Sequence, residues 1–93
     1  MIKNFLCKQT ERLYNGEPCP SKFRAFQVQA ERKLQMLDSA ASLAFLRSPP
    51  GNRLEALSGN RDGQHSIRIN DQWRLCFIFI DGNCHNVEIV DYH

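Results

Sequence analysis

The chain has 93 residues, 42% of them hydrophobic and 24% charged, which fits one small folded domain over residues 1–93 and excludes a disordered chain. Its formal net charge of +2 is too small for a protein that binds nucleic acid by bulk charge alone. The longest apolar stretch, residues 76–80, is too short to cross a bilayer, so a membrane protein is excluded as well.

The first half of the chain predicts a strand and two helices. Residues 1–5 alternate enough for a short strand, and residues 8–14 can form one or two helical turns, which the turn signal at residues 15–16 ends. Ser21 has the residue type of an N-cap for a second helix over residues 22–40. Five apolar side chains recur there at helical spacing, as expected for a helix that packs one stripe on a sheet: Phe23, Phe26, Ala30, Leu34 and Leu37.

The second half predicts an antiparallel meander. After a break rich in Pro and Gly, strands are expected over four segments: 53–57, 64–69, 73–80 and 84–92. Tight turns at residues 70–72 and 81–83 join the last three. The predicted fold class is therefore α+β, with a short N-terminal strand, two helices and an antiparallel meander sheet. The helices cover one face of the sheet, and the other face is either solvated or functional.

The cysteines predict neither a metal site nor a cofactor. None of the four is paired as C-x-x-C, and Cys84 and His85 are adjacent, which is poor spacing for two ligands of one ion. Cys76 lies within a strand pattern, where a reduced thiol packs as a small hydrophobe. The N-terminus lacks the apolar core of a signal peptide, so the expected location is the cytoplasm.

Arginines concentrate in the predicted strands. Residues 47–76 contain five arginines and no lysine, and the planar guanidinium suits bidentate phosphate contacts, although scattered surface arginines are the alternative. Arg74 lies in the most hydrophobic strand, where a guanidinium requires an anion. That anion is either a structural carboxylate, Asp91 or Glu88, or a bound phosphate.

The end of the chain, Asp91-Tyr92-His93, places three proton-handling groups in succession. In a strand Asp91 and His93 share one face and Tyr92 points to the other, so all three converge only if the strand bends or frays. A carboxylate, a phenol and an imidazole near arginines are suited to proton transfer at a phosphodiester.

Two segments resemble the HigB branch of the RelE/ParE toxin superfamily, and the likeness extends over nearly the whole chain. The first runs from Pro49-Pro50-Gly51-Asn52-Arg53-Leu54 to Ile69-Asn70-Asp71-Gln72-Trp73-Arg74, and the second is Val87-Glu88-Ile89-Val90-Asp91-Tyr92-His93. The resemblance implies a RelE-like microbial RNase fold and a toxin of a type II toxin–antitoxin system. Such toxins are mRNA interferases that cleave mRNA on the ribosome by attack of the ribose 2′-OH, without a metal. The implied partners are a HigA-like helix-turn-helix antitoxin, the ribosome and mRNA, with operator DNA reached only through the antitoxin.

Site residues follow from the same resemblance. Asp91, Tyr92 and His93 match the family's catalytic cluster, Arg74 its phosphate-binding arginine, and Asn70 lies beside the site. His93 or Asp91 would be the base, Tyr92 an acid or orienting group, and Arg74 would stabilise the phosphorane. Candidate contacts to ribosomal RNA are Lys22, Arg24, Arg53, Arg61 and Arg68.

Glu55 departs from the family pattern, because some relatives have a histidine in this region. A carboxylate here can act as a base, but it also repels phosphate. The alternative function is therefore a weakly active or non-catalytic toxin homologue that acts with its antitoxin in autoregulation of the operon. A third possibility is a module that binds RNA or protein through its sheet face.

Overall fold

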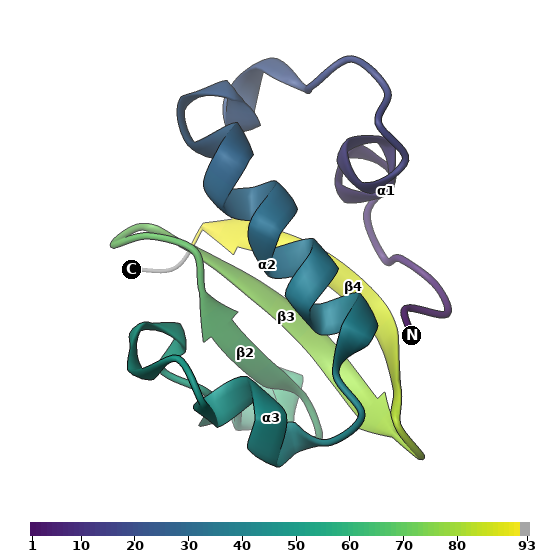
Figure 1. The fold of residues 1–93 in the computed structure, drawn as a ribbon, viewed down its shortest axis with the longest axis vertical. Helices are drawn as coiled ribbons and strands as arrows, with labels where there is room; N and C mark the ends of the chain where they lie inside the picture. Colours follow the sequence, from purple (N-terminus) through teal and green to yellow (C-terminus); the bar gives the residue numbers. More distant parts are fainter. Residues whose placement is uncertain (92–93) are drawn as a thin grey trace.

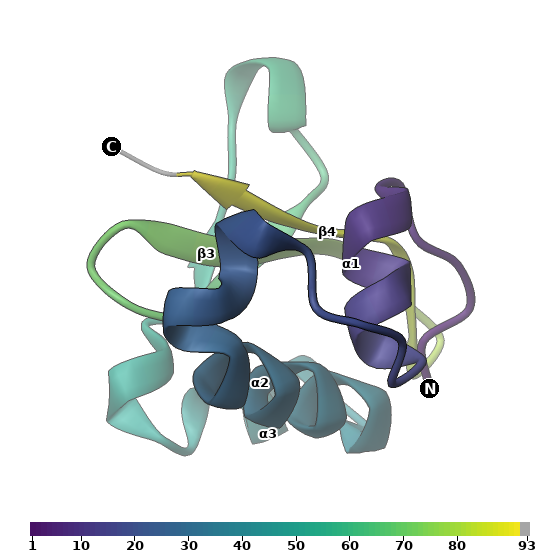
Figure 2. The same cartoon turned by 90° about the horizontal axis from the view of Figure 1, so that it is seen from above.

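The computed structural model describes residues 1–91 and shows helices packed on one face of a sheet (Figure 1). The elements in chain order are α1 (Lys8–Tyr14), the 3-10 helix η1 (Ser21–Phe26), α2 (Gln27–Ser39), α3 (Leu43–Arg47), η2 (Pro50–Asn52), β1 (Glu55–Ala56), η3 (Gly59–Arg61), β2 (His65–Arg68), β3 (Trp73–Ile80) and β4 (Asn83–Asp91). Figure 2 places α1, α2 and α3 on the same side of β3 and β4. Within the described residues, no helix has the length and apolar content of a membrane span.

The four strands form an antiparallel meander in the order β1-β2-β3-β4, as predicted. Asp81 and Gly82, between β3 and β4, have φ values of 49° and 78°, the left-handed conformations that a type I′ hairpin requires. The turn between β2 and β3 is closed by Asn70, whose Oδ1 accepts hydrogen bonds from the backbone N–H groups of Gln72 at 2.9 Å and Trp73 at 2.8 Å. Residues within each turn therefore set its conformation, which is why both turns could be predicted from the sequence.

The core lies between the sheet and α2. Alternate residues of the strands face the helices, and Ile67, Leu75 and Phe77 are fully buried there. The apolar stripe predicted for the second helix meets them, with Leu34 and Leu37 at 1% and 0% exposure. Burial of these side chains is the main source of stability, at about 1.5–3 kcal/mol for each large apolar side chain.

The second predicted helix is divided into two parts. Residues 21–26 form the 3-10 helix η1, and Phe26, with φ −130° and ψ 26°, separates it from α2. The tighter 3-10 spacing places Phe23 and Phe26 on one side, where their rings lie 5.8 Å and 5.1 Å from the ring of Trp73. The expectation that Ser21 caps the helix was wrong, since Pro20 occupies the N-cap position of η1 and no side chain caps it.

The predicted N-terminal strand is reduced to two isolated bridges. Ile2 and Phe5 pair in parallel with Cys84 and Val87 of β4, and the N–H of Ile2 donates to Asp38 Oδ1 of α2 at 2.8 Å. The segment therefore closes the outer edge of β4 without becoming a regular strand.

The strand predicted over residues 53–57 is also shorter than expected. Only Glu55 and Ala56 pair with β2, because Arg53 adopts a left-handed conformation with φ 44° at the end of η2. The outer edge of the sheet at β1 is therefore only two residues long.

Candidate functional site

A row of four residues crosses the sheet on the face opposite the helices. Glu55, Ser66, Cys76 and Glu88 are successive Cα partners in β1, β2, β3 and β4, and residues paired across strands share a face. Arg74 is two residues from Cys76 and therefore lies on this same face. We call Glu55, Arg61, Gln64, Ser66, Arg74 and Glu88 the polar face.

Arg74 is nearly buried, with 7% of its side chain exposed. Its Nε donates to Ser66 Oγ at 2.8 Å, and its Nη2 donates to the backbone carbonyls of Arg53 at 2.6 Å and Ser66 at 3.3 Å. The carboxylate of Glu55 lies 3.2 Å from Nη2. The anion that the sequence required for Arg74 is therefore supplied at least in part by Glu55, which was not among the expected partners.

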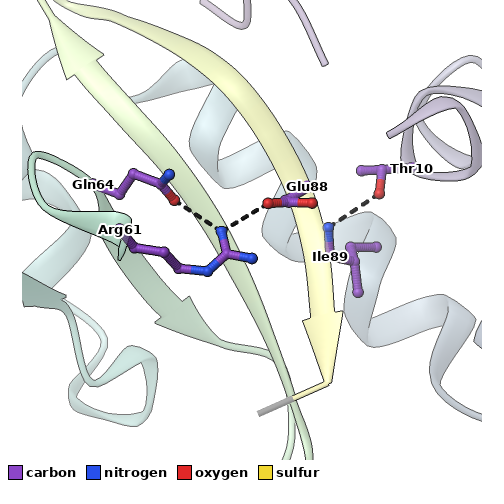
Figure 3. Close-up of polar contacts among 5 residues, drawn as sticks. All are labelled: Thr10, Arg61, Gln64, Glu88 and Ile89. Carbon is purple, nitrogen blue, oxygen red and sulfur yellow. Dashed lines mark hydrogen bonds and ion pairs between the residues drawn. The ribbon is translucent and has the colours of Figure 1, made fainter. Parts of the chain in front are cut away.

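Arg61 is the more accessible guanidinium, with 37% of its side chain exposed. Its Nη1 donates to Glu88 Oε1 at 2.7 Å and to Gln64 Oε1 at 3.1 Å (Figure 3). The hydrogen bond that Arg61 donates to Glu88 raises the pKa of Arg61. Glu88, which the sequence offered as a partner of Arg74, thus holds Arg61 instead.

Adjacent residues of β4 bind partners on the polar face and at the outer edge of the sheet (Figure 3). Glu88 reaches Arg61 on the polar face, whereas the N–H of Ile89 donates to Thr10 Oγ1 of α1 at 3.1 Å. The Cys76 thiol is fully buried, and this burial raises its pKa. The positive charges of Arg61 and Arg74 lower the pKa of the thiol by a smaller amount. A protonated buried thiol is inert, so Cys76 is a packing residue.

A hollow of about 280 Å³ opens beside β1. It is lined by Glu55, Ala56, Leu57, Ser58 and Arg61, so a carboxylate and a guanidinium both border it. A larger hollow of about 500 Å³ lies on the helix side, between α1 and α2, and is bordered by Tyr14, Glu31 and Asp38 together with apolar residues. We take the smaller hollow as the candidate site, because only it borders an arginine that can bind a phosphate.

The predicted catalytic cluster is only partly described. Asp91 pairs with Trp73 and Val90 with Arg74, so by register Asp91 lies on the opposite face of the sheet from Arg74. Asp91 Oδ2 accepts a hydrogen bond from Gln72 Nε2 at 3.0 Å. Tyr92 and His93 lie outside the described residues, so their predicted roles stay predictions.

The predicted RNA contacts are distributed around the molecule. Arg68 forms an ion pair with Asp71 at the β2–β3 turn, and the side chain of Asn70 is used to close that turn. Arg53 joins the polar face through its backbone carbonyl.

The remaining two predicted contacts, Lys22 and Arg24, belong to η1, which packs on Trp73 opposite Asp91. The ammonium of Lys22 lies 5.2 Å from the ring centre of Phe23. These two cations therefore lie near the end of β4, away from Arg61. Among residues 1–91, no three His, Cys, Asp or Glu side chains gather as metal ligands would.

Comparison with known proteins identifies the family. A family model described as "RelE-like toxin of type II toxin-antitoxin system HigB" matches residues 3–93. The chain belongs to this family. This HigB-like toxin is 34% identical to "Endoribonuclease HigB" of Proteus vulgaris in an alignment of 98 positions that covers 100% of both chains. The resemblance seen in the sequence is thereby confirmed, and the helices and antiparallel sheet fit the expected RelE-like α+β fold.

Two further relatives match over shorter stretches. "Toxin HigB-1" of Vibrio cholerae serotype O1 is 55% identical over 51 residues, which are 55% of this HigB-like toxin and 54% of the Vibrio protein. An uncharacterised Haemophilus influenzae protein is 38% identical over 56 residues, or 60% and 55% of the two chains. The chain thus spans about half the length of these two relatives.

Proposed function

We propose that this HigB-like toxin is an endoribonuclease that cleaves mRNA on the ribosome and so inhibits translation. The observation that carries the proposal is the polar face, where two arginines lie on one side of the sheet beside a hollow bordered by Arg61. The full-length likeness to a protein named as an endoribonuclease supports the same reaction.

The chemistry requires three kinds of group. A base removes the proton of the ribose 2′-OH, the 2′-oxygen attacks the adjacent phosphorus, and the bond from phosphorus to the 5′-oxygen breaks. An acid protonates that oxygen, and a 2′,3′-cyclic phosphate remains. A guanidinium stabilises the extra charge on the phosphorane. Asp91, Tyr92 and His93 are the candidates for proton transfer, Arg61 and Arg74 are the candidates for charge stabilisation, and no metal is needed for these steps.

Dependence on the ribosome is supported by the small surface that this site offers to RNA. Glu55, which lines the hollow, is 49% exposed, and the net charge of the chain is only +2. A site of this kind gains most from having its substrate positioned by a larger body. The exposed cations Lys22 and Arg24 and the half-buried Arg68 are then contacts to ribosomal RNA.

The expected partner is a HigA-like antitoxin with a helix-turn-helix domain, through which the toxin reaches operator DNA. Membership of a type II toxin–antitoxin family implies an antitoxin of some kind. The toxin acts in the cytoplasm, where translated mRNA is present.

Mapping of mRNA 5′-ends in a translating extract tests the proposal. The intact chain is compared with His93→Ala, and translated message with naked RNA. Cuts that occur only on translated message and fade in the variant are the expected result. Folded protein that leaves translated message uncut would refute the nuclease function.

A second candidate function is a toxin homologue with little activity that serves in operon autoregulation. The contact between Glu55 and Arg74 favours it, because a carboxylate there occupies one of the positions that a phosphate would take. Growth arrest that disappears in His93→Ala, while antitoxin binding is retained, would exclude this candidate.

A further inference from the structure

We propose that Glu55 is the general base of the cleavage reaction, acting on a ribose held in the hollow between β1 and η3. The inference rests on the proposed nuclease function and assigns a residue to its first proton transfer. Glu55 borders the hollow together with Arg61, and half of its side chain, 49%, is open to solvent. Its carboxylate is therefore accessible to a hydroxyl group of a bound nucleotide.

Glu55 and Arg74 are held by a common residue. The Cα partner of Glu55 across the sheet is Ser66, and Ser66 accepts hydrogen bonds from Arg74 through both its hydroxyl at 2.8 Å and its carbonyl at 3.3 Å. The carboxylate of Glu55 in turn lies 3.2 Å from Arg74 Nη2. A base and a guanidinium fixed to one strand residue keep a constant separation, which proton transfer next to a phosphate needs.

The backbone around Glu55 is also well fixed. β1 has only two residues, but the N–H of Leu57 donates to the carbonyl of Gln64 at 2.9 Å and extends the pairing beyond Ala56. Gln64 is at the same time the residue that, with Glu88, orients the guanidinium of Arg61. The two charged groups that border the hollow are thus tied to each other through the η3 loop.

The charges allow a phosphate to approach despite the carboxylate. The polar face carries two arginines, Arg61 and Arg74, against two glutamates, Glu55 and Glu88, so its formal charge is zero. Glu88 is paired with Arg61 at 2.7 Å, and its side chain is only 17% exposed. Glu55 is the more exposed carboxylate, and it is the one that borders the hollow, so it meets the substrate.

The proposed step balances as follows. The proton of the 2′-OH passes to the carboxylate of Glu55, and the 2′-oxygen forms a bond to phosphorus. The bond from phosphorus to the 5′-oxygen breaks, and that oxygen takes a proton from an acid of the C-terminal cluster. Arg61, which borders the hollow, faces the phosphate oxygens while the charge develops, and Arg74 holds the carboxylate of Glu55 in place. Glu55 then releases its proton to water and the acid takes one up from water, which restores both groups.

Single-turnover cleavage of mRNA on programmed ribosomes tests this role, with Glu55→Gln as the variant and Glu17→Gln as the matched control. Glu17 is exposed and lies before η1, away from the polar face. Gln keeps the size of the side chain and an oxygen for Arg74 but cannot take a proton. We expect Glu55→Gln to cleave about 100-fold more slowly or worse, as loss of a general base does, and Glu17→Gln to cleave like the unmodified chain.

A second measurement separates a base from a merely structural carboxylate. Added formate should restore part of the cleavage rate in Glu55→Ala, because the open hollow admits a small carboxylate. Formate should not restore the rate in Arg61→Ala, which lacks a cation and not a base. Thermal melting of each variant gives the folded fraction to which rates are referred.

The outcomes distinguish the two proposals. If the unmodified chain cleaves and Glu55→Gln cleaves equally fast or faster, the base assignment is overturned. Glu55 then blocks the access of a phosphate to Arg74. Absence of formate rescue in folded Glu55→Ala overturns it as well. If the unmodified chain itself leaves ribosome-bound mRNA intact, the nuclease function fails and the base assignment fails with it.

Discussion

Arg74→Ala is expected to destabilise the fold strongly, whatever Arg74 does for RNA. The side chain is 7% exposed and donates to Ser66 Oγ, to the Ser66 carbonyl and to the Arg53 carbonyl. Truncation leaves these acceptors and the carboxylate of Glu55 without the guanidinium. Each buried acceptor that loses its donor costs about 1–3 kcal/mol, so we expect a total loss of about 3–5 kcal/mol.

That loss is a large part of the total stability. A chain of this size has a free energy of unfolding of roughly 5–14 kcal/mol, at about 0.05–0.15 kcal/mol per residue. A loss of about 3–5 kcal/mol corresponds to a fall in Tm of about 15–30 °C for a domain of this length. Arg74→Lys should lower the free energy of unfolding by a smaller amount, about 1–3 kcal/mol, because one ammonium group cannot reach all the acceptors that the guanidinium reaches.

Urea and thermal unfolding, followed by circular dichroism, measure the effect. Arg68→Ala is the matched control, since Arg68 is the Cα partner of Arg74 in β2 but pairs with Asp71, whose side chain is 97% exposed. An exposed pair contributes about 0–1 kcal/mol. If Arg74→Ala costs no more than Arg68→Ala, the reasoning that the buried hydrogen bonds of Arg74 stabilise the fold is refuted.

Three further predictions follow from single contacts. Arg61→Ala should lower the free energy of unfolding by less than about 1 kcal/mol, because the Arg61 side chain in its pair with Glu88 is 37% exposed. The same variant should slow cleavage on programmed ribosomes by about 100-fold. A loss of rate that is explained by unfolding of the variant would contradict this prediction. Asn70→Ala should lower Tm by about 5 °C, since two backbone N–H groups of the β2–β3 turn lose their acceptor, and an unchanged melting curve would refute that role. Burial raises the pKa of the Cys84 thiol from 9.0 to about 11, so the folded state binds this proton more tightly than the unfolded state does. The contribution of this thiol to the free energy of unfolding should be complete below pH 9 and should fall between pH 9 and 11 in reducing buffer. Cys84→Ala should show a weaker dependence of stability on pH over this range.

The meander was predictable because its signals are local. Turn residues such as Asn70 and Gly82 act within a few positions, and the apolar periodicity of residues 22–40 identified the stripe that packs on the sheet. The division of that segment into η1 and α2 was not predictable, because it depends on where Trp73 lies relative to Phe23 and Phe26. Tertiary contacts here outweigh helix propensity.

The need of Arg74 for an anion was predictable from the sequence, but the ion pairs on the polar face were not. The sequence left Asp91, Glu88 or a bound phosphate as the anion for Arg74, and Glu55 was not among them. The pairs Glu55–Arg74 and Arg61–Glu88 depend on the register of four strands, including the irregularity between Cys76 and Ile78. A shift of one residue in any strand would move these side chains to the other face, and no local pattern fixes four registers at once.

The contacts between the two ends of the chain have a consequence for synthesis. The N–H of Lys3 donates to the carbonyl of Cys84, and the N–H of Leu6 donates to the carbonyl of Val87. The first residues to be synthesised therefore cannot form these hydrogen bonds until the last strand has been synthesised. At about 5–20 residues per second, the interval is about 4–16 s for these 81 residues. Glu88, which orients Arg61, belongs to the same late strand. A nascent chain therefore lacks both its closed sheet and its oriented guanidinium until its final strand has emerged and docked.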